Sequence, residues 1–160
     1  MKKITLIALC AVLALTTLAA CGKKGEAVAD VPTADILAAM KDALGEDMPM
    51  MGEIDAATLE SLYGIKASDV AEFSGTMAMI NVRADELIVF KAKDGKTDDI
   101  KAAIEKRKAD LDSVWSQYLP DVYEYVKNAQ VVEKGDYVLF VVLPDAQKAV
   151  DAFDTALTVK

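Results

Sequence analysis

From residue 33 onward, the apolar residues of this chain recur with two different spacings. A spacing of three or four positions predicts amphipathic helices, whereas alternating or unbroken apolar runs predict strands. The first spacing predicts helices near residues 33–44, 55–63, 97–119 and 144–157, and a short helical segment at 121–128. The second predicts strands near 70–82, 86–93, 131–133 and 137–143. Between them, residues 46–54 carry Met and Pro and are expected to form a loop.

The first two helices have recognisable ends. Thr33 and Asp55 are side chains that can accept a hydrogen bond from the first turn of a helix, so each is expected to be an N-cap. Gly45 and Gly64 follow the last apolar residues of the same helices and predict their C-terminal ends.

The order α-α-β-β-α-β-β-α predicts an α+β fold. The strands near 86–93 and 137–143 are the most apolar, so both are expected at the centre of the sheet with both faces buried. The result is a four-stranded antiparallel sheet in the order 1-2-4-3, covered by packed helices. Residues 84–85 and 134–136 are expected to form the turns within the two strand pairs.

Arg107 is an unusual residue in the predicted long helix, because it falls in the middle of the helix's apolar stripe. A charge that faces a core needs a partner. Glu86 lies on the same strand face as Ile88 and Phe90, so its carboxylate is the candidate partner. The leading interpretation is a structural ion pair. The alternatives are an anion-binding arginine in a cleft, or an arginine whose head group reaches solvent.

Three aromatic side chains, Trp115, Tyr118 and Tyr123, gather around Pro120 together with a fourth, Tyr125. Aromatic residues of this kind can line a groove for a carbohydrate or a peptide. They also fit the core and rim of a junction between two helices. The sequence leaves both interpretations open, and we treat the three residues as a candidate aromatic surface.

The N-terminal segment has the three parts of a secretion signal. Lys2 and Lys3 precede an apolar stretch over residues 4–15, and small residues follow it. The stretch is shorter than the ~20 residues of a transmembrane helix. Leu18 stands where ordinary signal cleavage needs a small residue, but it suits the lipobox of bacterial lipoproteins, which this segment resembles.

In a lipobox the cysteine receives a diacylglyceryl group and becomes the first residue of the mature chain. We therefore expect a signal peptide over residues 1–20 and a lipid on Cys21. Residues 21–31 are small and charged and predict a flexible tether, and residues 32–160 predict one domain. The expected location is the extracytoplasmic face of the cell membrane, with the bilayer as a partner through the acylated cysteine.

Composition excludes several classes of function. Of 18 basic residues, Lys2 and Lys3 leave with the signal, so the mature chain has 16 basic and 26 acidic residues and a formal charge of −10. A surface this acidic repels nucleic acid. The chain has no histidine, and lipidation uses the one cysteine that remains after Cys10 is removed. Without these ligands we expect no metal site and no cofactor.

Four short segments and one single residue resemble the domain of unknown function 4358 family, found in small bacterial lipoproteins. The segments are residues 62–65 (Leu-Tyr-Gly-Ile), 85–91 (Asp-Glu-Leu-Ile-Val-Phe-Lys), 118–120 (Tyr-Leu-Pro) and 135–138 (Gly-Asp-Tyr-Val), and the single residue is Arg107. The resemblance implies an extracytoplasmic lipoprotein. It implies no particular chemistry.

Taken with the absence of a recognisable nucleophile, base or metal motif, these features predict a non-enzymatic binding or interaction module. Its ligand would be an envelope protein or a small molecule. The alternative is a histidine-free hydrolase that uses two carboxylates on a cell-wall or sugar substrate.

Overall fold

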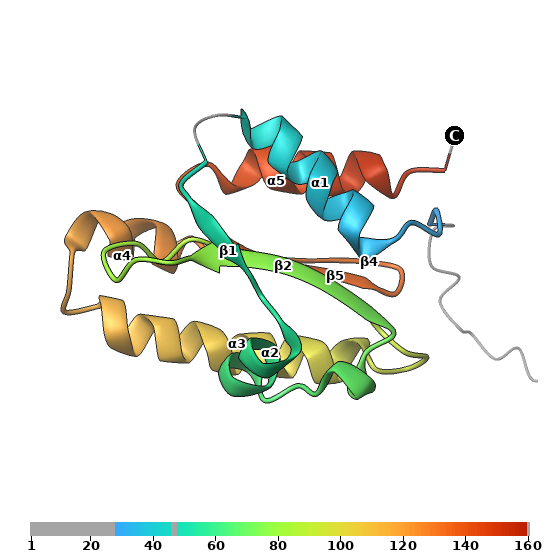
Figure 1. Ribbon diagram of the computed structural model, residues 1–160, viewed down its shortest axis with the longest axis horizontal. Coiled ribbons are helices and arrows are strands. Elements are labelled where there is room, and N and C mark those ends of the chain that lie inside the picture. Colours follow the sequence, from blue (N-terminus) through green and yellow to red (C-terminus); the bar gives the residue numbers. More distant parts are fainter. Residues whose placement is uncertain (1–27, 46–47, 160) are drawn as a thin grey trace, which may run out of the picture.

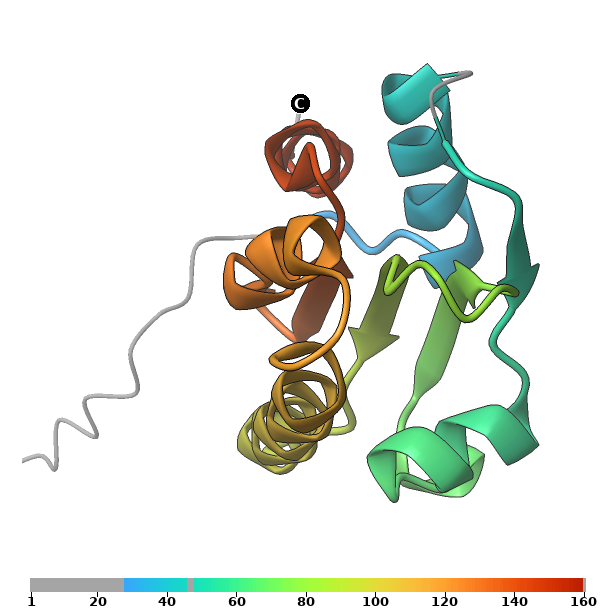
Figure 2. The same cartoon turned by 90° about the vertical axis from the view of Figure 1, so that its left-hand side faces the viewer.

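A five-stranded antiparallel sheet lies between two layers of helices (Figures 1 and 2). The structure is a computed structural model that describes residues 28–45 and 48–159. The strands are β1 (Met51–Glu53), β2 (Glu72–Ala78), β3 (Glu86–Lys91), β4 (Gln130–Lys134) and β5 (Tyr137–Val142), in the order β1-β2-β3-β5-β4. The helices are α1 (Thr33–Leu44), α2 (Ala56–Tyr63), α3 (Thr97–Trp115), α4 (Pro120–Lys127) and α5 (Ala146–Ala156), with a 3₁₀ turn η2 (Ala67–Asp69).

The two central strands bury side chains on both faces, as their unbroken apolar sequences predict. On β3, Ile88 and Phe90 pack in a core with α2 and α3, while Leu87 and Val89 pack in a second core with α1 and α5. Tyr63 at the end of α2 places its ring edge-on to Phe90, with the centroids 5.6 Å apart. The α+β fold and the order of the four predicted strands are therefore confirmed.

The prediction of four strands is wrong, because β1 adds a fifth at the edge of the sheet. It lies within the predicted loop and pairs antiparallel with the end of β2, from Met51 opposite Ala78 to Glu53 opposite Thr76. Three residues are too few for an apolar alternation to be recognised in the sequence. Gly52, in the middle of β1, lies so close to the Met79 side chain that a Cβ there would overlap the thioether.

Several predicted element boundaries also need correction. Pro32, rather than Thr33, occupies the N-cap position of α1, and the Thr33 hydroxyl instead shares a hydrogen bond with the Ser74 hydroxyl. Helix α3 ends at Trp115 instead of residue 119. Leu119 takes a positive φ of 47° before the proline that starts α4, a position where helical backbone is disfavoured. Helix α5 begins at Ala146, two residues later than predicted.

The connection between β2 and β3 is longer than the predicted two-residue turn. Strand β2 ends at Ala78, whose N–H donates to the Asp85 carbonyl, and β3 begins at Glu86, so residues 79–85 form a loop. The predicted N-cap of α2 and the predicted turn between β4 and β5 are confirmed: the Asp55 carboxylate accepts from the Thr58 N–H at 2.7 Å, and Gly135 takes a positive φ of 64°.

The last residues of the predicted tether pack against the domain. Val28 forms an isolated bridge with Thr158, and the Asp30 carboxylate pairs with Lys91. The Tyr137 hydroxyl accepts from the Val31 N–H at 3.0 Å. The last residues of the predicted tether therefore make specific contacts with the domain that follows.

Cys21 and the predicted signal peptide lie outside the described residues. Within the described part of the chain, no helix combines the length and the apolar character needed to cross a bilayer.

Candidate functional site

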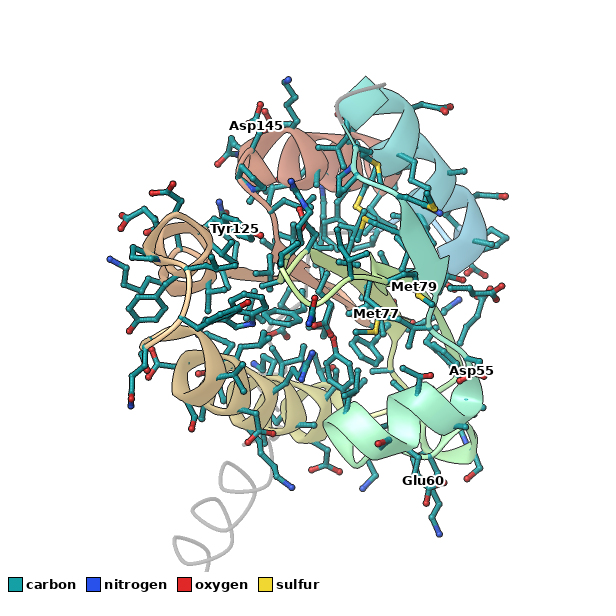
Figure 3. All side chains as sticks on the ribbon, turned by 60° about the vertical axis from the view of Figure 1, so that its left-hand side comes forward. Asp55, Glu60, Met77, Met79, Tyr125 and Asp145 are labelled. Carbon is teal, nitrogen blue, oxygen red and sulfur yellow. The ribbon has the colours of Figure 1, made fainter. Side chains whose placement is uncertain are left out.

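A cleft of about 620 Å³ opens at the end of the sheet where β2 turns toward β3. Its walls come from the β2–β3 loop, the β1–α2 connection and the last turns of α3. Figure 3 shows Met77, Met79 and Asp55 on the same side of the molecule, beside β1 and above α2. The cleft is lined by predicted site residues from two elements, Glu86 of β3 and Arg107 and Trp115 of α3.

The structure brings Glu86 and Arg107 together in this cleft. Glu86, the first residue of β3, is 1% exposed. The Arg107 Nη2 and Nε atoms donate to its Oε2 at 2.8 and 3.1 Å. The Tyr63 hydroxyl donates to Oε1. One buried carboxylate thus receives donors from α2 and α3, which links both helices to the central strand.

The ionisation of the three groups follows from their burial and their mutual contacts. Burial, and then the charge of Glu86, raise the pKa of Tyr63 well above its ordinary value of 10.0, so the hydroxyl stays protonated. Burial lowers the pKa of Arg107, but nearby negative groups, chiefly the charge and hydrogen bonds of Glu86, raise it, and the net shift is upward. Arg107 therefore stays cationic, with its side chain 13% exposed.

The contacts of Arg107 show how its guanidinium is placed. The guanidinium does not extend into solvent. Its Nε and Nη2 edge is occupied by Glu86, so an external anion would have to displace a buried carboxylate to use that edge. The arrangement favours a structural ion pair that forms one wall of the cleft.

A second ion pair, which the sequence did not predict, lies in the β2–β3 loop. The Arg83 Nε and Nη2 atoms donate to the two carboxylate oxygens of Asp85 at 2.6 and 2.7 Å. The Tyr125 hydroxyl donates to Asp85 at 3.3 Å and accepts from the Ala84 N–H at 3.1 Å. The residue assigned to a turn is therefore a buried anchor that holds the loop to α4. An arginine two positions before an aspartate was the available sequence signal.

The three predicted aromatic residues differ in their exposure and in their partners. Trp115 is 6% exposed and lines the cleft, with its ring 5.7 Å from the ring of Tyr118. Tyr118 is about half exposed beside it. Tyr123 lies at the α3–α4 junction, where its hydroxyl donates to Asp112 at 2.7 Å and Lys127 lies over its ring. Trp115 alone of the three lines the cleft.

The exposed apolar side chains at this end of the molecule come mainly from the loops. Met50 is 87% exposed, Met79 68%, Ile80 55% and Val82 46%. Met79 and Ile80 line the cleft directly. The sequence assigned these residues to a strand or a loop and missed their exposure, because the predicted strand runs four residues past the observed end of β2. We call these four residues the apolar rim.

The cleft also contains four carboxyl groups, and three of them have fixed partners. Asp85 and Glu86 are paired with arginines, and Asp55 caps α2. The hydrogen bonds from Thr58 lower the pKa of Asp55. Glu53, the fourth, is exposed. Among the described residues, no group of three or more acidic or cysteine side chains is arranged to hold a metal ion.

Comparison with known families then places the chain. Residues 45–143 match the family described as Domain of unknown function (DUF4358). The chain belongs to this family. The matched segment contains all five strands and the whole cleft, and it ends before α5. No curated protein and no solved structure gives a significant match.

Proposed function

We propose that this DUF4358 protein is a membrane-anchored extracytoplasmic lipoprotein whose domain binds a partner without catalysing a reaction. The observation that carries the proposal is the exposed apolar rim, of which Met79 and Ile80 line the cleft. Methionine is unbranched and polarisable, and it adapts to differently shaped partners. Exposed apolar side chains grouped beside a concave surface are typical of interaction sites.

The position of the cleft relative to the start of the domain supports presentation to a partner. Strand β3 runs from Glu86 in the cleft to Lys91, which pairs with Asp30 near the first described residue. Six strand residues span about 17 Å. In Figure 1 the segment that leads into α1 lies at the right and the β2–β3 loop at the left. If Cys21 carries the lipid anchor, the cleft would lie at the opposite end of the domain from that anchor.

The carboxylate hydrolase is the less favoured function. A glycoside hydrolase needs one carboxyl that is protonated near neutral pH, beside a second that is ionised. The lowered pKa of Asp55 acts in the opposite direction, and the two buried carboxylates are each held by an arginine. Turnover of a peptidoglycan or glycan library, lost on Glu53→Gln or Asp55→Asn, would overturn the binding proposal.

Site-specific crosslinking in intact cells tests the binding proposal. A photoreactive amino acid replaces Ile80 or Val82 in the rim of the full-length protein, and Gln147 on the exposed side of α5 is the matched control position. We expect the same adduct from both rim positions and none from position 147. The adduct should also disappear when Ile80→Glu is introduced beside a probe at Val82. Equal labelling from all three positions, or no adduct from the rim, contradicts the proposal.

A further inference from the structure

Strand β1 has an outer edge whose main-chain groups pair with no other strand of the described residues. It is the terminal strand of the sheet, and no other strand of the described residues lies beyond it. The Ile54 N–H donates to the Gly75 carbonyl at 2.9 Å. Because antiparallel ladders alternate, Gly52 also directs its N–H and C=O toward β2. Met51 and Glu53 therefore direct theirs outward.

Grooves border β1 on both faces of the sheet. Helix α1 packs over β2 and β3, and a groove of about 650 Å³ lies between it and β1, with Leu37 and Met51 among its apolar walls. The cleft described above borders the opposite face, and Glu53 and Asp55 line both spaces. Figure 2 shows β1 at the margin of the sheet, with α1 above it and α2 below.

A buried hydroxyl group in the first groove has no hydrogen-bond partner among the described residues. Thr76 on β2 is 1% exposed, and its Oγ1 atom makes no hydrogen bond within the described part of the chain. Thr76 lies opposite Glu53 of β1 and contributes to the groove lining. A buried polar atom without a partner costs free energy that a polar group entering the groove would recover.

We propose that an extended segment of a partner protein adds to the outer edge of β1 as a sixth strand. This inference rests on the proposed binding function and gives its mode. Successive side chains of a strand point to opposite faces of the sheet, so alternate residues of the segment enter the groove beside α1 and the cleft beside α3. Main-chain hydrogen bonds to Met51 and Glu53 supply affinity, and the two grooves supply specificity.

The charges around β1 define the chemistry of that segment. In the cleft, the carboxylates of Asp85 and Glu86 are neutralised by arginines, whereas Glu53 and Asp55 have no basic partner among the described residues. Lys41 adds a positive charge on the α1 side. The partner segment therefore carries apolar residues at alternate positions and a basic residue directed toward the cleft, which also suits the acidic mature chain.

Selection from a library of random nonapeptides, displayed on phage against the full-length protein in detergent, tests the inference. Selected peptides should alternate apolar residues and carry net positive charge. The deciding variant is Met51→Pro, because proline is tolerated on an edge strand where the lost N–H faces outward. Met51→Leu keeps the N–H and is the matched control. Met51→Pro should weaken binding of a selected peptide about tenfold, because one carbonyl of the peptide loses its N–H donor. The affinity of Met51→Leu should stay within about threefold of the wild type.

A second measurement keeps the test independent of the folding of Met51→Pro. In the wild-type protein, hydrogen exchange at the Met51 and Glu53 amides should slow when the selected peptide is added, and exchange at the Gly52 amide should change little. Unprotected Met51 and Glu53 amides, peptides with helical spacing, or no enriched peptide each overturn strand addition. Dimerisation that depends on protein concentration and is lost in Met51→Pro would also overturn the proposal, because a second copy of this chain would then occupy the edge. If the rim crosslinks persist in Met51→Pro, strand addition alone is rejected. If the wild-type background gives no rim crosslinks at all, the binding function itself is rejected.

Discussion

Arg107 on α3 and the buried Glu86 at the start of β3 form an ion pair, with the Nη2 and Oε2 atoms 2.8 Å apart and the Arg107 side chain 13% exposed. The pair crosses the layer between the long helix and the centre of the sheet. Tyr63 donates to the other carboxylate oxygen of Glu86, so α2 is joined to the same point. One buried charge thus fixes the relative positions of three elements that form the cleft.

Removing one member of the pair should strongly destabilise the protein. Arg107→Ala leaves the Glu86 carboxylate buried without its counter-charge, and losses of this kind are about 3–5 kcal/mol in the free energy of unfolding. The double variant with Glu86→Ala should lose less than the sum of the single variants. Urea unfolding of all three measures the coupling. Lys108→Ala, which breaks an exposed pair with Glu105, should change stability by less than about 0.5 kcal/mol. Additive effects would show that the pair contributes no coupling.

The hydroxyl of Tyr63 should make stability depend on alkaline pH. Its folded-state pKa is raised above the ordinary 10.0, chiefly by burial, so its contribution is complete below that pH and is lost as the pH rises toward the folded value. Tyr63→Phe should cost about 1–3 kcal/mol at neutral pH, because one Glu86 oxygen loses its donor, and should flatten the loss of stability above about pH 10. Urea midpoints across a pH series measure both effects, with Tyr118→Phe as an exposed control. An unchanged alkaline slope in Tyr63→Phe contradicts the argument.

The contacts that the sequence predicts best are those fixed by the periodicity of two regular elements. The direction of Glu86 follows from strand alternation and that of Arg107 from helical spacing, so two facing elements bring them together. Leu87 and Ile88 were likewise assigned to opposite buried faces, and the two cores confirm it. None of these predictions needed the length of a loop.

The features that the sequence did not reveal depend on chain ends and loops. Strand β1 exists because the end of β2 offers it a partner, and three residues carry no period of their own. Asp85 was assigned to a turn, although its carboxylate is held by Arg83 and Tyr125 across a longer loop. The apolar rim was hidden for the same reason, since a run of apolar residues does not show where hydrogen bonding to the neighbouring strand stops.

Gly52 in β1 and Gly75 in β2 should respond differently to replacement by alanine. A Cβ at Gly75 would lie 2.8 Å from the Cβ and Cγ1 atoms of Ile88, a β-branched residue packed in the core. Gly75→Ala should therefore destabilise the protein by about 1–3 kcal/mol, as overpacking does. A Cβ at Gly52 would meet the exposed side chain of Met79, which can rotate away, so Gly52→Ala should cost clearly less. Thermal unfolding of both variants ranks them. The reverse ranking would show that the sheet edge is less adaptable than the core.

The N-cap of α2 should contribute stability that is lost in acid. The Asp55 carboxylate accepts from the Thr58 N–H, and this lowers its pKa in the folded state. A carboxyl with a lowered pKa stabilises the fold above its ordinary value of 3.8, and that stabilisation disappears as the pH falls through the folded value. Asp55→Ala should lower the melting temperature at pH 7, whereas Asp55→Asn, which keeps an acceptor oxygen, should lower it less. Equal melting temperatures for Asp55→Ala and the wild type would show that the cap contributes nothing.

Cys21 should decide whether the protein stays with the membrane. Each buried methylene of an acyl chain contributes ~0.8 kcal/mol, and two or more chains make attachment stable where one gives marginal binding. Cys21→Ala should therefore move the protein from the membrane fraction to the soluble fraction or leave the signal uncleaved, while Cys10→Ala, within the predicted signal, should leave the distribution unchanged. Mass spectrometry of the mature N-terminus is the direct measurement, and we expect a diacylglyceryl-modified cysteine as the first residue. An unmodified N-terminus at any residue after Cys21 would rule out the lipid anchor, and with it the orientation of the cleft away from the bilayer. The strand-addition site on β1 does not depend on the anchor and would still be judged by its own test.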